Sequence, residues 1–183
     1  MYQFGSTAPI QAFIRLIFLF LTFAVPLAAG TDKVDFSIVG GIQFTVPGNW
    51  PVIASKSGPE KAVFAFQIPN PADEGTPDST NLSIVSSHLK DAKDREDFER
   101  KSLESKEHSE EKKLGDNWRC RTFSALQKST EYVIWDCYRV IADCGVYVRI
   151  AWPHLPKNSP DYDKQMESVL SDFLASIAPS KKP

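Results

Sequence analysis

Residues 118–152 carry the strongest indication of a fold, and they read WRCRTFSALQKSTEYVIWDCYRVIADCGVYVRIAW. Three segments of this stretch, 118–126, 132–141 and 146–152, are rich in the β-branched and aromatic residues that favour strands. The connectors, 127–130 and 142–145, are short enough for hairpins. The stretch therefore predicts an antiparallel meander of three strands.

An amphipathic helix is expected after the meander. Ser159 is a good N-cap, and Pro160 occupies the first turn, where proline is tolerated. Apolar residues then recur at helical spacing and form one broad stripe: Tyr162, Met166, Val169, Leu170, Phe173, Leu174 and Ile177. A helix with such a stripe is expected to pack on the sheet and to end at Ala178-Pro179.

The first half of the mature chain predicts further strands and one polar helix. Alternating residues indicate strands within 36–46, at Phe64–Ile68 and at Leu82–Ser86, whereas the proline-rich remainder of 47–80 is interpreted as mostly loop. Charged residues of both signs dominate Lys90–Lys113, where we expect a solvated helix capped by Asp94. The whole order predicts an α+β fold, a mainly antiparallel sheet packed with two principal helices.

The first 30 residues resemble a secretory signal peptide. Arg15 precedes the apolar run Leu16–Val25, Pro26 interrupts it, and the small residues of Leu27–Gly30 suit a signal peptidase. The run is short for a membrane span, so an uncleaved anchor is the weaker alternative. We therefore expect a single α+β domain over 31–183, periplasmic or secreted, with no stable membrane anchor after cleavage.

The three cysteines are interpreted in the light of that compartment. Cys120 and Cys137 fall on neighbouring predicted strands, so they are the expected disulfide pair, with Cys144 left free. Buried thiols are the alternative. The spacing fits neither a zinc site nor a CxxC redox motif.

Sequence motifs for catalysis are absent. His88, His108 and His154 are the only histidines, and none stands at i,i+4 from another potential ligand. The sequence contains no Gly-x-Ser-x-Gly elbow. A formal net charge of −2 does not support a large basic surface for nucleic acid. We therefore expect no catalytic residues, no metal, no cofactor and no nucleic-acid partner.

Aromatic and arginine side chains in the meander suggest a surface for a protein partner. Trp, Tyr and Arg dominate interface energetics, and one sheet face of a two-layer fold can stay open. The residues that would form this patch are Trp118, Trp135, Tyr138, Arg139, Tyr147 and Arg149. The alternative is that the tryptophans fill the core.

Two short motifs resemble the PsbP/Mog1-like superfamily. One is the phrase F-x-V-P-x-x-W at Phe44–Trp50, and the other is the helical pattern of Met166–Phe173. The resemblance extends over residues 36–178 and implies the same α+β fold. Its members include extrinsic assembly or stability factors, small-GTPase binders and secreted bacterial proteins, so the resemblance implies protein binding without selecting a partner.

These observations favour an exported, non-enzymatic domain that binds another protein. It would act as an envelope assembly or stability factor, or as an inhibitor of its partner. An immunity protein that neutralises a delivered toxin is an alternative, with the acidic loop Pro71–Gly75 or the charged helix facing a basic cleft. A small-ligand carrier or an enzyme that uses a pocket between sheet and helix is the second alternative.

Overall fold

The computed structural model describes residues 32–69, 80–104, 109–115, 117–127, 129–154 and 161–180. The expected signal peptide, residues 1–30, and the acidic loop Pro71–Gly75 lie outside the described residues. Within the described part, no helix has the length and apolar character needed to cross a membrane.

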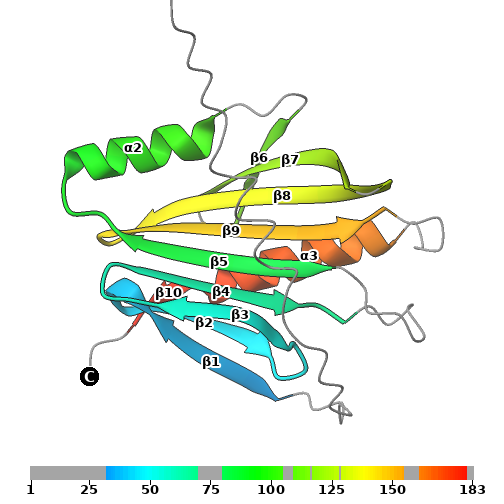
Figure 1. Ribbon diagram of the computed structural model, residues 1–183, viewed down its shortest axis with the longest axis horizontal. Coiled ribbons are helices and arrows are strands. Elements are labelled where there is room, and N and C mark those ends of the chain that lie inside the picture. Colours follow the sequence, from blue (N-terminus) through cyan, green and yellow to red (C-terminus); the bar gives the residue numbers. More distant parts are fainter. Residues whose placement is uncertain are drawn as a thin grey trace, which may run out of the picture.

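The described chain forms two antiparallel sheets and two α-helices (Figure 1). The seven-stranded sheet has the order β3-β4-β5-β9-β8-β7-β6, and the three-stranded sheet has the order β1-β2-β10. This arrangement confirms the expected α+β class. The bounds are β1 Lys33–Ile38, β2 Ile42–Pro47, β3 Val52–Ser57, β4 Lys61–Gln67, β5 Asn81–His88, α2 Ala92–Leu103, β6 Glu110–Leu114, β7 Trp118–Gln127, β8 Thr130–Ile141, β9 Cys144–Pro153, α3 Tyr162–Ser176 and β10 Ala178–Pro179.

The predicted meander is present as β7, β8 and β9, and its register fixes which side chains share a face. Cys120 stands opposite Cys137, and Cys137 stands opposite Val148. Since side chains alternate along a strand, these three define one face of the large sheet, which we call the α3 face. Asp136, paired with Arg149, marks the other, which we call the α2 face.

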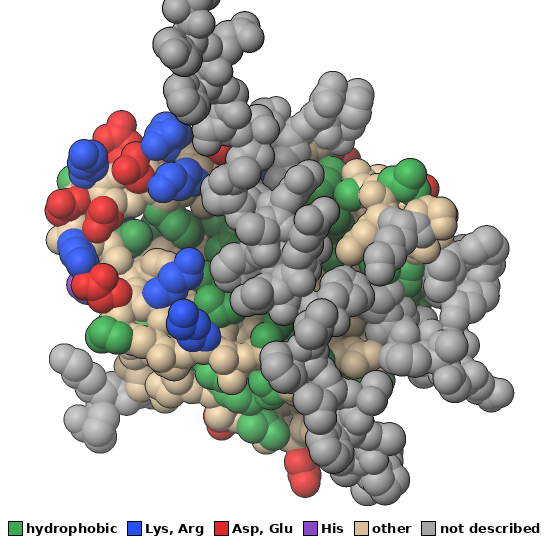
Figure 2. Space-filling model, viewed as in Figure 1, with side chains coloured by type: hydrophobic (Ala, Val, Ile, Leu, Met, Phe, Trp, Pro, Cys, Tyr) green, Lys and Arg blue, Asp and Glu red, His purple; other side chains and the backbone are tan. Residues whose placement is uncertain are grey.

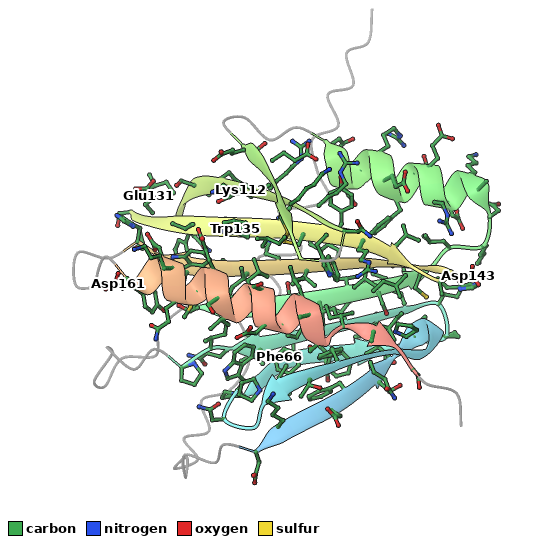
Figure 3. All side chains as sticks on the ribbon, turned by 180° about the vertical axis from the view of Figure 1, so that it is seen from behind. Phe66, Lys112, Glu131, Trp135, Asp143 and Asp161 are labelled. Carbon is green, nitrogen blue, oxygen red and sulfur yellow. A yellow bond between two sulfur atoms is a disulfide. The ribbon has the colours of Figure 1, made fainter. Side chains whose placement is uncertain are left out.

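The core lies between the α3 face and a layer made of α3 and the small sheet. Rings from both layers meet there with centroids 5.3–6.4 Å apart, and they belong to Phe36, Phe44, Phe64, Phe66 and Phe173. Figure 3 shows α3 lying across this face of the sheet. Five residues of the predicted apolar stripe are buried within α3: Tyr162, Met166, Leu170, Phe173 and Leu174.

The start of α3 differs from the prediction at Ser159. The helix begins at Tyr162, and Asp161 is its N-cap residue. Ser159 and Pro160 lie outside the described residues. A carboxylate in the first turn, Asp163, accepts a hydrogen bond from the Trp152 indole nitrogen at 2.7 Å and joins the helix start to β9.

Helix α2 packs on the α2 face through few contacts. Asp91, not the predicted Asp94, is its N-cap: the Asp91 side chain accepts from the Asp94 amide at 2.8 Å, and the Asp94 side chain accepts from the Lys90 amide at 3.1 Å. The first bond caps the helix, and the second holds the residue that precedes the N-cap against the first turn. On the packed side, the Phe98 ring meets the Tyr138 ring edge-on at 6.4 Å between centroids.

Two strands appear where the sequence predicts loop or helix. β3 lies in the proline-rich segment, and β6 lies at the end of the charged segment, whose helix stops at Leu103. Both are terminal strands of the large sheet. Each strand has only one neighbouring strand, so it can form without the regular alternation of apolar residues that a central strand shows. The charged side chains of β6 also protect that edge from further strand pairing.

Candidate functional site

The expected aromatic and arginine patch is divided between the two faces of the large sheet. Alternation from the paired registers places Trp118, Trp135 and Arg139 on the α3 face. Tyr138 and Tyr147 stand opposite each other on the α2 face, next to the Asp136–Arg149 pair. The six residues therefore do not form one continuous surface, which corrects the expectation.

Both tryptophans of the expected patch are in the core. The exposed fraction is 1% for Trp118 and 2% for Trp135, because α3 and its flanking strands cover their face. Figure 3 shows Lys112 of β6 beside Trp135, and the Lys112 ammonium lies 5.1 Å from the centroid of that ring. The two tryptophan side chains bury large apolar areas, which stabilises the fold, and they give no exposed surface to a partner.

Tyr138 is also covered, in this case by α2. Its exposed fraction is 4%, and the Arg119 guanidinium lies 5.4 Å from its ring centroid. Burial raises the pKa of Tyr138 above its ordinary value. The side chain is therefore a neutral packing residue beneath α2.

Arg149 is already paired within the α2 face. Its Nε and Nη2 atoms donate to the two oxygens of Asp136 at 2.6 and 2.8 Å, a bidentate ion pair. Burial is the largest single influence and opposes the charged form of Arg149, but the hydrogen bonds and charge of Asp136, together with the interactions of Tyr147, outweigh it and raise the Arg149 pKa. Burial also raises the pKa of Tyr147, whose ring centroid lies 5.9 Å from the Arg149 guanidinium. Partner binding by Tyr147 or Arg149 stays a prediction.

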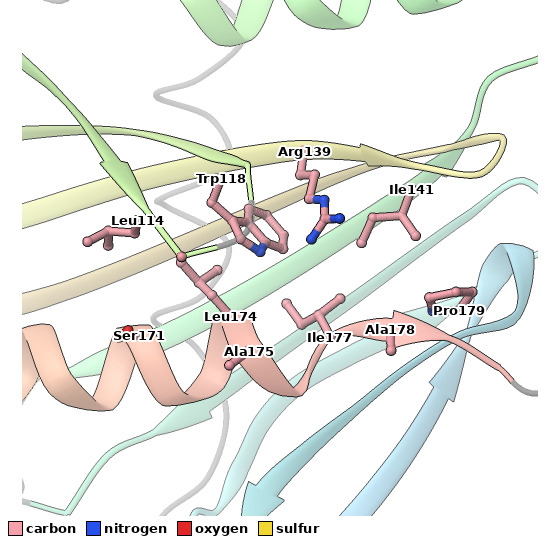
Figure 4. Close-up of a pocket in the computed structure, with 11 residues that line it drawn as sticks. Leu114, Trp118, Arg139, Ile141, Ser171, Leu174, Ala175, Ile177, Ala178 and Pro179 are labelled. Atoms are coloured by element: carbon pink, nitrogen blue, oxygen red, sulfur yellow. The ribbon is translucent and has the colours of Figure 1, made fainter.

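The structure brings Trp118 and Arg139 together in a pocket of about 380 Å³ between α3 and the β6–β8 side of the sheet. Figure 4 shows the Arg139 side chain reaching between Trp118 and Ile141 toward the C-terminal end of α3. The other lining residues are mostly apolar: Leu114, Gly115, Ser171, Leu174, Ala175, Ile177, Ala178 and Pro179. Arg139 is the only ionisable side chain among the described residues of this lining. The pocket is therefore suited to binding an anion and offers no acid–base pair.

A second candidate surface lies along β1 and β3, each of which is a terminal strand of its sheet. Three apolar side chains are largely exposed there, with exposed fractions of 43% for Val34, 47% for Val52 and 44% for Ile53. Phe36 and Phe64 are partly buried and pack against the core behind them. We call these five residues the apolar edge. Figure 2 shows hydrophobic side chains along the margin formed by β1 and β3, whereas charges of both signs cover the end formed by α2.

The apolar edge is not predicted from the sequence, because the proline-rich segment that contains β3 is typical of a loop. Pro51 and Pro59 flank the strand, and Val52-Ile53 is the only apolar pair before a polar run. The register of β3 on β4 also shifts between Val52 and Ala54. The signal available in the sequence was Val52-Ile53 itself, a β-branched pair directly after the turn at Gly48–Trp50.

Candidate nucleophiles and ligands do not assemble into a reactive site in the described residues. The described residues contain no group of three or more His, Cys, Asp or Glu side chains that could hold a metal ion. His88 and His154 are exposed, and His108 lies outside the described residues. Burial raises the pKa of the Cys144 thiol, which favours its unreactive protonated form.

The expected disulfide is confirmed. Cys120 and Cys137 are bonded across the directly opposed pair of β7 and β8, and both are fully buried on the α3 face. Cys144 is the free cysteine of the described chain. Its sulfur lies 3.7 Å from the Val39 carbonyl oxygen, and a Cβ on Gly40 would overlap it, so this thiol fills a tight space against the turn between β1 and β2.

No protein-family model and no curated protein matches this sequence. Three solved structures are similar in fold. A protein from Bacteroides thetaiotaomicron is 15% identical with a TM-score of 0.49; the alignment covers 81% of this chain and 48% of that protein, so the chain spans about half its length. The Ran-binding protein Mog1p of Saccharomyces cerevisiae is 13% identical with a TM-score of 0.49, covering 82% of this chain and 96% of Mog1p.

The third is PsbP from the cyanobacterium Synechocystis, solved in solution. It is 12% identical with a TM-score of 0.41, and the alignment covers 86% of this chain and 98% of PsbP. Mog1p and PsbP give their names to the PsbP/Mog1-like superfamily, which the two sequence motifs resemble. The likeness concerns the fold alone, since a shared fold does not carry a shared function.

Proposed function

We propose that the protein is an exported, non-enzymatic domain that binds another protein, and that the apolar edge is its contact surface. The observation that carries the proposal is the exposure of Val34, Val52 and Ile53 on two strands that each end a sheet. The Phe36 ring of β1 contacts the Phe64 ring of β4 at 5.4 Å between centroids and joins the two sheets at this margin, and exposed apolar side chains gathered at one margin are typical of protein contact surfaces. The disulfide supports an oxidising compartment, as the leader-like residues 1–30 do.

The edge offers a partner backbone as well as side-chain contacts. β3 pairs only with β4, and β1 pairs only with β2, so each has one side without a strand neighbour in the described chain. A strand from a partner can add to such a side through main-chain hydrogen bonds, with nearby apolar residues supplying affinity. Lys56 on β3 is exposed and limits unspecific pairing along the rest of the strand.

The matching experiment purifies the tagged full-length chain from its own host after chemical cross-linking. We expect a stoichiometric partner with the unaltered chain and its loss with Ile53→Asp, because a charge would be buried in the interface. Leu126→Asp is the matched control: Leu126 is 77% exposed near the end of β7 and lies outside the apolar edge. The captured partner is then purified and rebound to both variants to show direct contact.

Retention of the partner by Ile53→Asp, or recovery of the chain alone, would contradict the proposed function. Mass spectrometry of the purified chain also tests export, which predicts a mature N-terminus near Thr31. The phenotype of a gene deletion separates two roles that such a complex could serve: assembly or stability of the envelope, and immunity to a delivered toxin. A constant envelope defect indicates an assembly or stability factor, and a defect seen only beside toxin-delivering cells indicates an immunity protein.

A further inference from the structure

The pocket beside α3 holds a cation without a counter-charge. Arg139 is half-buried and extends into a lining whose other side chains are mostly apolar (Figure 4). Among the residues that the structure describes, Arg139 has no hydrogen-bond acceptor and no ion-pair partner. Arg149, by contrast, is bound at both ends of its fork by Asp136.

Such an arrangement favours an anion in the pocket. A guanidinium that is partly removed from water loses hydration, and a charge-assisted hydrogen bond restores the lost interactions. The planar fork of arginine matches the two oxygens of a carboxylate. Among the described lining residues Arg139 is the one ionisable side chain, so it neutralises a single negative charge; a dianionic phosphate monoester would keep one charge against apolar walls.

The remainder of the lining is suited to a hydrocarbon chain. Leu114, Ala175 and Pro179 offer accessible apolar surface there, and the volume of about 380 Å³ falls in the lower range of small-ligand pockets. Pro179 has no N–H, and Ser171 supplies the only side-chain hydroxyl of the lining.

We propose that this pocket binds a small monocarboxylate with an apolar tail, such as a medium-chain fatty acid. The carboxylate pairs with Arg139, and the tail lies along Leu114 and the C-terminal turn of α3. Gly115 leaves one side accessible, since a Cβ at this position would meet no atom within 4 Å. The site is separate from the apolar edge and does not depend on the proposed protein partner.

Calorimetric titration of the purified protein with sodium decanoate tests the proposal. We expect one molecule bound per chain and a Kd below about 1 mM. Arg139→Gln removes the charge at a half-buried position and is expected to weaken binding tenfold to a hundredfold, the range for a hydrogen bond to a charged group. Lys112→Gln is the matched control, because Lys112 is a cation on the same sheet face outside the pocket lining.

Decan-1-ol separates the role of the charge from that of the tail. It has the same chain length without the carboxylate, so it is expected to bind more weakly and to be insensitive to Arg139→Gln. Ala175→Trp fills the pocket from an exposed position on α3 and is expected to abolish decanoate binding with an unchanged circular dichroism spectrum. Absence of decanoate binding, equal binding by Arg139→Gln, or equal binding of the alcohol would overturn the proposal.

Discussion

The packing of α2 on the sheet predicts an unusual effect for the substitution Gly145→Ala. Gly145 lies on β9 directly beneath Phe98 of α2, and a Cβ added there would lie 2.7, 2.8 and 2.9 Å from Cδ2, Cε2 and Cγ of that ring. Normal contacts between such atoms begin near 3.4 Å. The ring is also held against Tyr138, so it cannot move without losing that contact.

Whether Gly145→Ala lowers or raises the free energy of unfolding depends on whether Phe98 is present. Overpacking of a filled site costs about 1–3 kcal/mol, and replacing glycine by alanine in an allowed backbone stabilises by about 0.4–1 kcal/mol through the unfolded chain. We therefore expect Gly145→Ala to lower the free energy of unfolding by about 1–2 kcal/mol in the natural chain. In the Phe98→Ala background the same change should raise it by about 0.5 kcal/mol.

Urea denaturation followed by circular dichroism measures both effects in one double-mutant cycle. Gly58→Ala is the matched control, since a Cβ there meets only the Lys61 carbonyl oxygen at an ordinary 3.6 Å. It is expected to be neutral or slightly stabilising in either background. A cycle with no coupling between positions 98 and 145 would show that α2 does not pack through Phe98, and the reasoning would be refuted.

Three further stability predictions concern the disulfide, the buried ion pair and the core helix. Replacing both Cys120 and Cys137 by Ala should lower the free energy of unfolding, measured by urea titration, by about 3 kcal/mol. This is the entropic contribution expected for a cross-link between residues separated by 17 positions. Asp136→Leu should cost about 1.5–3 kcal/mol because the half-buried Arg149 loses the acceptor of its charged hydrogen bonds, and adding Arg149→Met should recover most of that loss in a calorimetric scan. Leu170→Ala should cost about 2–5 kcal/mol by thermal unfolding, since Leu170 is fully buried.

The architecture was predictable where one residue pattern had one structural solution. The meander and the apolar stripe of α3 each combine period, length and turn residues that agree with one another. The pairing of Cys120 with Cys137 followed from the same hairpin. β3 and β6 could not be found in this way, because terminal strands are stabilised from one side and their sequences lack a two-residue period of apolar side chains.

The candidate site was less predictable because burial depends on what covers each face. Alternation alone places Trp118 and Trp135 with the two bonded cysteines and places Tyr138 on the opposite face. The sequence does not state that α3 covers the first face or that α2 covers Tyr138. The expectation of one open aromatic patch failed for this reason.

The two arginines of the expected patch show most directly what tertiary structure adds. Arg139 and Arg149 both stand in apolar strands of the meander and are equivalent as sequence features. The register places Arg149 opposite Asp136 and Arg139 opposite Val146, a difference set by the length of the hairpin between β8 and β9. One guanidinium is thereby neutralised within the fold and the other is kept unpaired at the edge of an apolar pocket. A shift of this register by one residue would place Arg149 opposite Trp135 or Cys137 instead of Asp136, so the pairing of Arg149 is a consequence of the register and not of composition.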